Sequence, residues 1–277
     1  MPPLPSTLSE CGRFRLVDQI GAGGESYVYS ATRVADGAWF AVKVMTEMSA
    51  PDDVYEHVLA TVHHESLVLP VEPAIMIDGY DAYVLPLHQQ DLRSLLVEHP
   101  AGMPVEAVRR LVLSALVPLQ LLHTHSLVHG DIKPDNYLIS ASGELLLADF
   151  GSCRHVEDRG IFPLTPQYVC KHDRDFQTRG ASYRATFETR TLDIYAFGVM
   201  VAEMLLGPTY PAPVDAVASI ARVCPLAADF IQQCTSVDFN LRPSVTSLFE
   251  HAWLRCEESV NAAAVGTEGD VDMPSAV

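Results

Sequence analysis

The chain has 277 residues and a formal net charge of −17, with 18 lysines and arginines against 35 aspartates and glutamates. This acidity disfavours nucleic acid and anionic membrane surfaces as partners, and where it serves more than solubility it favours basic protein segments. The six cysteines form no C-x-x-C pair, and the chain shows neither a signal-peptide pattern nor an apolar run of membrane length. We therefore expect free thiols in an intracellular compartment, the cytoplasm or the nucleus.

Five short runs in the first third of the chain predict β-strands. The first three alternate apolar and polar side chains, and the turn dipeptides Asp36-Gly37 and Asp78-Gly79 separate two pairs of runs. The runs cover residues 13–20, 26–32, 39–45, 75–77 and 82–87. Residues 1–12 are rich in proline and serine and are expected to be flexible. The pattern predicts a small, mostly antiparallel sheet.

Helical patterns dominate the rest of the chain. Residues 51–64 carry valines on one stripe, and residues 104–124 are apolar nearly all round, as expected of a buried helix. Another apolar helix is expected to begin near Asp193. Residues 257–277 are small and acidic and are expected to be disordered. A sheet followed by helices predicts an α+β fold.

A glycine cluster lies between the first two predicted strands, formed by Gly21, Ala22, Gly23 and Gly24 and followed by Val28. Glycine allows backbone N–H groups to approach a phosphate closely. A dinucleotide-binding fingerprint would need a parallel strand and a helix, which the hairpin context does not offer. Taken alone, such a cluster is more often only a hairpin turn.

The most informative stretch is HGDIKPDNYLISASGELLLADFG, residues 129–151. Asp131, Lys133 and Asn136 lie on one short loop, and an apolar run that predicts a strand leads to Asp149. A loop, a hairpin and a second acidic turn would bring the two aspartates and the asparagine into one small space.

Such a cluster is suited to phosphoryl transfer, which needs an oriented hydroxyl and a metal ion to neutralise phosphate charge. Asp131 is suited to orient the attacking hydroxyl and to accept its proton, and Lys133 to balance charge on the transferring group. Asn136 and Asp149 offer the oxygen ligands that Mg²⁺ prefers. The sequence therefore predicts a magnesium-dependent phosphotransfer site.

The order H-x-D-x-K-x-x-N followed by D-F-G resembles the catalytic loop and metal-binding turn of the protein kinases. The resemblance covers residues 13–255 and implies a bilobal α+β fold. A small, mostly antiparallel β N-lobe would span about residues 13–87, and a larger helical C-lobe about residues 91–255. The lysine in the motif indicates serine/threonine rather than tyrosine specificity. The string HGDIKPDN also resembles the Bub-family checkpoint kinases.

The resemblance implies an ATP and Mg²⁺ site between the lobes and a protein substrate presented to the catalytic loop. The implied catalytic residues are Asp131, Lys133, Lys43 and Glu56. The residues implied to contact the nucleotide are Gly21, Ala22, Gly23, Gly24, Val28, Ala41, Lys43, Pro86, His88, Asp91 and Leu138. The implied metal ligands are Asn136 and Asp149.

The partner of Lys43 is left open by the sequence. In the protein kinases this strand lysine pairs with a glutamate of the following helix. Glu56 is the first choice because it lies in the middle of the predicted helix, and Glu47 and Glu65 are the alternatives.

The segment after the fifth predicted strand resembles the kinase hinge. The carbonyl of Pro86 and the N–H of His88 would bond the adenine, a role that proline can fill because it keeps its carbonyl. Asp91 would either contact the ribose or cap the helix that follows it.

The C-lobe departs from the kinase pattern at the A-P-E triplet, which is missing here. Asp193 matches the aspartate that accepts backbone N–H bonds from the catalytic loop. Arg242 matches the arginine that pairs with the missing A-P-E glutamate, and a buried arginine without a partner is costly. Asp173, Asp175 and Glu188 are the candidates for a substitute partner.

Gly130 stands where most protein kinases have an arginine that anchors a phosphorylated activation loop. No serine or threonine lies between Cys153 and Leu164, and Thr165 and Tyr168 match the T-x-x-Y pattern that usually precedes A-P-E. Our hypothesis is that the protein does not need activation-loop phosphorylation.

ATP-dependent transfer to serine or threonine hydroxyls of proteins is the preferred function, and two other classes stay open. The departures at Ser26 and Gly130 favour a pseudokinase that binds nucleotide as a switch or scaffold, but the catalytic set is complete. Small-molecule phosphotransferases also use H-G-D-x-x-x-x-N, although Lys133 and the D-F-G triplet disfavour them. Asp135 is either a solvated acid or a group that favours a basic substrate residue. The oligomeric state is left open.

Overall fold

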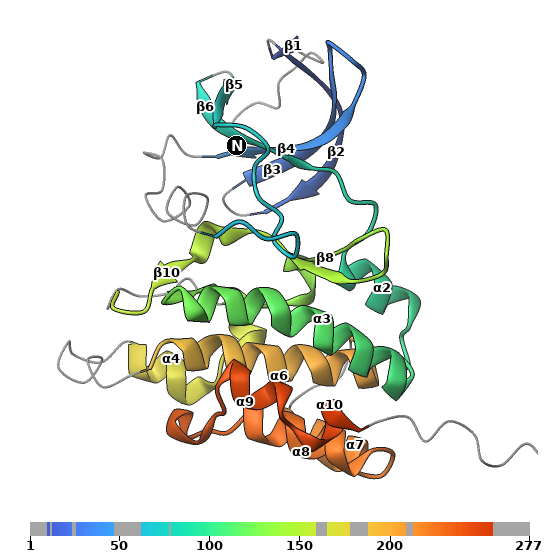
Figure 1. The fold of residues 1–277 in the computed structure, drawn as a ribbon, viewed down its shortest axis with the longest axis vertical. Helices are drawn as coiled ribbons and strands as arrows, with labels where there is room; N and C mark the ends of the chain where they lie inside the picture. The colour runs from blue at the N-terminus through green and yellow to red at the C-terminus, as the bar shows by residue number, and fades with distance from the viewer. Residues whose placement is uncertain are drawn as a thin grey trace, which may run out of the picture.

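The computed structural model describes residues 10–11, 13–23, 26–46, 62–77, 79–158, 165–177, 188–208 and 213–256. An antiparallel sheet forms one end of the molecule and a stack of helices the other, with residues 129–151 between them (Figure 1). In these ranges, no helix is both long and apolar enough to cross a membrane.

The sheet has six strands in the order β1-β2-β3-β4-β6-β5, and all neighbouring strands are antiparallel. The strands are β1 (Glu10–Cys11), β2 (Phe14–Ala22), β3 (Ser26–Arg33), β4 (Trp39–Met45), β5 (Ile75–Ile77) and β6 (Tyr80–Pro86). All five predicted strands are confirmed. Within the segment predicted to be flexible, residues 1–12, Glu10 and Cys11 pair with the start of β2.

Strand alternation decides which side chains of β4 face the rest of the molecule. Val42 is fully buried in the core of the sheet, where it packs with Phe14 and Val84. Because successive side chains of a strand point to opposite faces, Ala41 and Lys43 lie on the other face.

The helical part is built around α3 and α6, most of whose buried apolar residues belong to one large core. Its helices are α2 (Leu92–Glu98), α3 (Val105–Thr124), α4 (Lys171–Gln177), α6 (Arg190–Leu206), α7 (Pro213–Ala221), α8 (Pro225–Cys234), α9 (Val245–Phe249) and α10 (Ala252–Arg255). The buried helix predicted over residues 104–124 is confirmed as α3. Most of the helix predicted over residues 51–64 lies outside the described residues, and its end at 62–64 is not helical. The predicted tail, 257–277, also lies outside.

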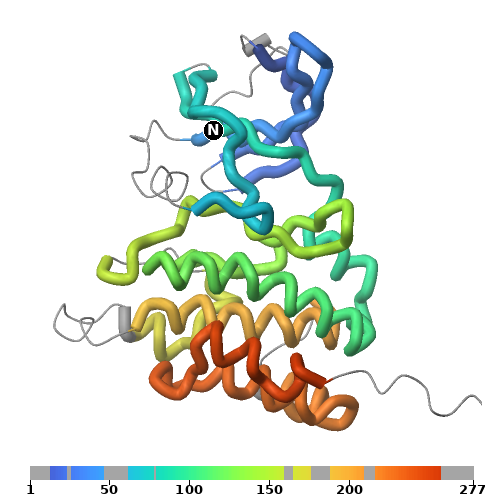
Figure 2. The backbone as a smooth tube through the Cα atoms, in the orientation of Figure 1, coloured from blue at the N-terminus to red at the C-terminus, as the bar shows by residue number. Residues whose placement is uncertain are grey.

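Two pairs of short strands belong to the region between the sheet and the helices. They are β7 (Leu127–Val128) with β10 (Arg154–His155), and β8 (Tyr137–Ile139) with β9 (Leu145–Leu147). Two further segments lie beside the β8–β9 pair (Figure 2): Leu67 forms a bridge to Leu147 of β9, and Asp91 forms a bridge to Leu138 of β8. Val68 N–H donates to Leu147 O at 2.8 Å, and Ile139 N–H donates to Gln90 O at 2.9 Å. These bonds fix the sheet against the residues that carry the candidate site.

Arg242 has its substitute partner in Asp173 of α4. The Nη1 atom of Arg242 lies 2.7 Å from Asp173 Oδ2, and both side chains are fully buried. Arg242 also donates to the carbonyls of Ser236 and Thr191, at 2.8 and 2.9 Å. Burial raises the pKa of the Asp173 carboxyl, and the charge of Arg242 offsets part of that effect. The choice among three acids is settled in favour of Asp173.

Asp173→Ala is expected to lower the free energy of unfolding by about 3 kcal/mol, because it leaves the Arg242 charge buried without its counter-ion. Urea denaturation checks this value. The control is Asp175→Ala, an exposed acid of the same helix, which should change stability by no more than about 1 kcal/mol, the upper range for an exposed ion pair. Equal losses in the two variants would contradict the assignment.

Candidate active site

The Asp193 carboxylate holds the backbone of the loop that precedes Asp131. Asp193 lies in the first turn of α6 and is buried. Its Oδ2 accepts the N–H of His129 and its Oδ1 accepts the N–H of Gly130, both at 2.9 Å. His123 of α3 adds a third contact, with Nε2 2.9 Å from Oδ2. The predicted role of Asp193 as a backbone acceptor is confirmed.

His129 connects this loop to the segment that carries Asp149. Its Nε2 lies 3.0 Å from the carbonyl of Ala148, and its Nδ1 accepts the Asp131 N–H at 3.3 Å. These partners fix the tautomer, because Nε2 must donate to the carbonyl and Nδ1 must accept. The ring also packs edge-on against Phe150, with centroids 5.4 Å apart. His129 is therefore buried between the two acidic segments and holds them together.

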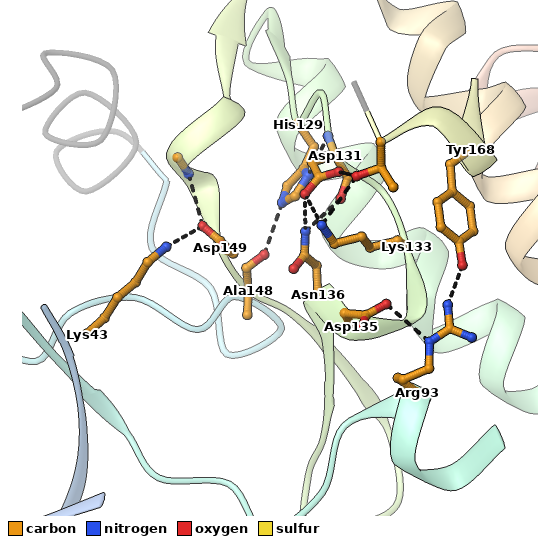
Figure 3. A network of polar contacts seen from close by, with 12 residues as sticks. Lys43, Arg93, His129, Asp131, Lys133, Asp135, Asn136, Ala148, Asp149 and Tyr168 are labelled. Atoms are coloured by element: carbon orange, nitrogen blue, oxygen red, sulfur yellow. Dashed lines mark hydrogen bonds and ion pairs between the residues drawn. The ribbon is translucent and has the colours of Figure 1, made fainter. Parts of the chain in front are cut away.

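The Asp131 carboxylate is held by three side chains (Figure 3). Lys133 Nζ lies 2.6 Å from Oδ2, and the Thr165 hydroxyl donates to Oδ1 at 2.6 Å. Asn136 Nδ2 donates to Oδ2 at 3.0 Å and to the Asp131 carbonyl at 2.7 Å. The structure thus brings together the predicted residues Asp131, Lys133 and Asn136. Sequence reasoning missed Thr165, for which the T-x-x-Y pattern was the available signal.

Lys43 of β4 reaches across to Asp149, the residue that begins the D-F-G turn. Its Nζ lies 2.6 Å from Asp149 Oδ1. Burial raises the pKa of the Asp149 carboxyl, but the adjacent Lys43 ammonium outweighs it, so the pKa lies below its ordinary value. Asp149 has a left-handed backbone, with φ at 59°, and its Oδ1 also accepts the Gly151 N–H at 3.3 Å. The pair of Lys43 and Asp149 joins the sheet to the segment that follows β9.

The predicted glutamate partner of Lys43 is not settled by the structure. Glu56 and Glu47 lie outside the described residues. Glu65, the third alternative, is exposed, and the described partner of Lys43 is Asp149.

The described residues predicted to bind nucleotide lie on five strands, β2, β3, β4, β6 and β8, and on the loops that follow β2 and β6. Gly21 and Val28 pair across β2 and β3, and Ala41 pairs with Leu85 across β4 and β6. Gly24 lies outside the described residues. Leu138 of β8 forms a bridge to Asp91. The adenine end of the predicted site therefore lies where β6 leads into α2.

Two of the predicted residues in this connection, Asp91 and His88, have contacts within the chain. Asp91 Oδ1 accepts the Ser94 N–H at 2.6 Å and caps α2, so the capping alternative is confirmed. Burial lowers the pKa of His88, and a bond to the Ile139 backbone offsets part of that shift.

The donor set at Asn136 and Asp149 fits a magnesium ion. Asn136 Nδ2 is engaged by Asp131, which orients the amide and leaves Oδ1, a hard oxygen ligand, for a cation. Asp149 offers Oδ2, since Lys43 contacts Oδ1. No cluster of three or more His, Cys, Asp or Glu side chains that could hold a metal occurs in the described part of the chain. Two protein ligands match the habit of Mg²⁺, which retains water and phosphate oxygens around it.

Comparison with known proteins gives one family. The protein kinase domain matches residues 14–254. The serine/threonine-protein kinase max-2 of Caenorhabditis elegans is 26% identical over 267 residues, which cover 88% of this chain and 40% of that protein. The serine/threonine-protein kinase PknL of Mycobacterium tuberculosis is 31% identical over 234 residues, covering 79% and 55%. The chain spans only 40% and 55% of the length of these relatives. By the family match, this chain belongs to the protein kinase domain family.

Proposed function

We propose that this chain transfers the γ-phosphate of ATP to serine or threonine hydroxyls of protein substrates. The observation that carries the proposal is the contact between Thr165 and Asp131, in which a hydroxyl donates to the carboxylate at 2.6 Å. A general base must come within roughly 2.6–3.2 Å of the hydroxyl whose proton it accepts. The serine/threonine-protein kinases to which the chain is similar support the same class of substrate.

In this proposal Asp131 orients the substrate hydroxyl and receives its proton. Its Oδ1 can accept that hydroxyl in addition to the hydroxyl of Thr165, because a carboxylate oxygen accepts more than one hydrogen bond. Lys133, 2.6 Å from Oδ2, is close enough to balance negative charge on the transferring group. Asn136 fixes the rotation of the Asp131 side chain through Oδ2.

The same proposal assigns the nucleotide to the space between the sheet and the catalytic loop. The glycine segment that begins at Gly21 and the Lys43 ammonium would bind phosphates, and Asn136 and Asp149 would hold Mg²⁺. When bound, the ion supplies positive charge for the phosphates. A chain that only bound a partner would have no physical need for this complete set.

Asp131→Asn is expected to reduce turnover by about 10²–10⁴-fold, because the amide cannot accept the proton. The measurement is phosphate transfer from Mg-ATP to histone or casein, with nucleotide binding measured in parallel. Lys43→Met serves as the control that removes phosphate binding. Full turnover by Asp131→Asn would contradict the assignment of the base. Nucleotide binding without transfer by the unmodified protein would favour a switch or scaffold instead.

Phosphatase treatment is expected to leave the transfer rate unchanged within about twofold, because Gly130 supplies no cation for a phosphate and side chains of residues 165–168 are bonded to the rest of the chain. Thr165 bonds Asp131, and Tyr168 OH donates to Glu203 Oε2 at 2.8 Å. Mass spectrometry before and after treatment establishes that phosphate has been removed. Loss of turnover on dephosphorylation would refute the hypothesis drawn from Gly130.

A further inference from the structure

Beside the catalytic loop lies a charged cluster that the mechanism above does not use. It consists of Arg93, Asp135, Tyr168 and Glu203, and we call it the Arg93 cluster. Its members come from four elements: α2, the short helical turn Pro134–Asn136, the turn Pro166–Tyr168, and α6. Because they are far apart in sequence, only the fold brings them together.

One guanidinium is shared by both acids of the cluster. Arg93 Nε lies 3.2 Å from Asp135 Oδ2, and Arg93 Nη2 lies 3.3 Å from Glu203 Oε2. Tyr168 OH donates to the same Glu203 oxygen at 2.8 Å and accepts a hydrogen bond from Arg93. Both acids therefore have a cation from within the chain.

The two acids differ in burial, and this decides which of them a substrate side chain can reach. The Glu203 side chain is 13% exposed, whereas Asp135 is 48% exposed. Burial raises the pKa of the Glu203 carboxyl, and the hydrogen bond from Tyr168 and the charge of Arg93 offset part of that effect. Without Arg93, Glu203 would be left with Tyr168 alone, and Asp135 would face solvent without a counter-ion.

The cluster lies next to two segments: the loop that carries Asp131, and residues 165–168, of which Thr165 contacts Asp131. Asp135 lies on the same loop as Asp131 (Figure 3), and Tyr168 follows three residues after Thr165, which donates a hydrogen bond to Asp131. A peptide whose hydroxyl reached Asp131 would have neighbouring side chains close to this edge of the loop. A bare pair of carboxylates at such an edge would select a basic side chain by charge complementarity.

We propose that Arg93 determines substrate specificity, because it supplies the cation that a basic substrate residue would otherwise bring to Asp135 and Glu203. The inference rests on the proposed transfer to protein hydroxyls. Sequence reasoning left open whether Asp135 selects a basic residue. With Arg93 in place, a substrate arginine gains only the exposed side of Asp135, where an ion pair contributes little.

The test compares the unmodified protein with Arg93→Gln, and with Arg93→Lys as the matched control that keeps the positive charge. Serine peptides carry arginine, alanine or glutamate at each of several positions on either side of the serine. The ratio of kcat/KM for arginine to that for alanine is measured at each position. In Arg93→Gln this ratio should rise by about fivefold or more at one position, the factor that a single newly formed ion pair contributes. The unmodified protein should show no preference for arginine at any position, and Arg93→Lys should keep the ratio of the unmodified protein.

A double variant identifies the partner of the new preference. Arg93→Gln combined with Asp135→Asn should lose most of the gain. The same peptides with alanine in place of serine, labelled for fluorescence anisotropy, report binding without turnover. If no variant transfers phosphate, the proposed function fails while the binding data still decide this inference. An arginine preference that is already present in the unmodified protein, or that is unchanged in Arg93→Gln, would overturn it.

Discussion

The carboxylate of Asp193 is the constraint on which the candidate site depends. It is buried at the start of α6 and accepts the N–H groups of two successive residues, His129 and Gly130, at 2.9 Å. A buried backbone N–H without an acceptor is costly, so these bonds fix the path of the loop that leads to Asp131. Since most buried apolar residues of α6 belong to the largest hydrophobic core of the described residues, the loop takes its position from a tightly packed helix.

Two further contacts connect this loop to the rest of the site. His129 binds the carbonyl of Ala148 and so places the next residue, Asp149. Asp149 in turn meets Lys43 from the sheet at 2.6 Å. The proposed base, the proposed metal ligands and the lysine proposed to bind phosphate are thereby connected through neighbouring contacts to one helix. Such preorganisation is suited to phosphoryl transfer, because the catalysis of this reaction depends mostly on positioning and on electrostatic stabilisation.

Local patterns in the sequence were sufficient for the strands, for α3, and for the roles of Asp193 and of Asp91 as a helix cap. Each of these depends on side-chain periodicity or on a short motif. The partner of Arg242 was not predictable, because Asp173, Asp175 and Glu188 differ only in how the chain folds between them. Thr165 and Arg93 were missed for the same reason. Their contacts with Asp131 and Asp135 join segments that are far apart in sequence, and no local pattern encodes them.

The central claim is tested most directly by Asp193→Asn. The amide keeps one acceptor oxygen but turns an N–H₂ group toward one of the two backbone donors, so the loop should lose its fixed path. The account predicts that phosphate transfer from Mg-ATP falls by at least about tenfold while the nucleotide dissociation constant changes by less than about threefold. Thermal unfolding in parallel confirms that the variant is folded. A folded Asp193→Asn protein that transfers phosphate at the unmodified rate would contradict the account.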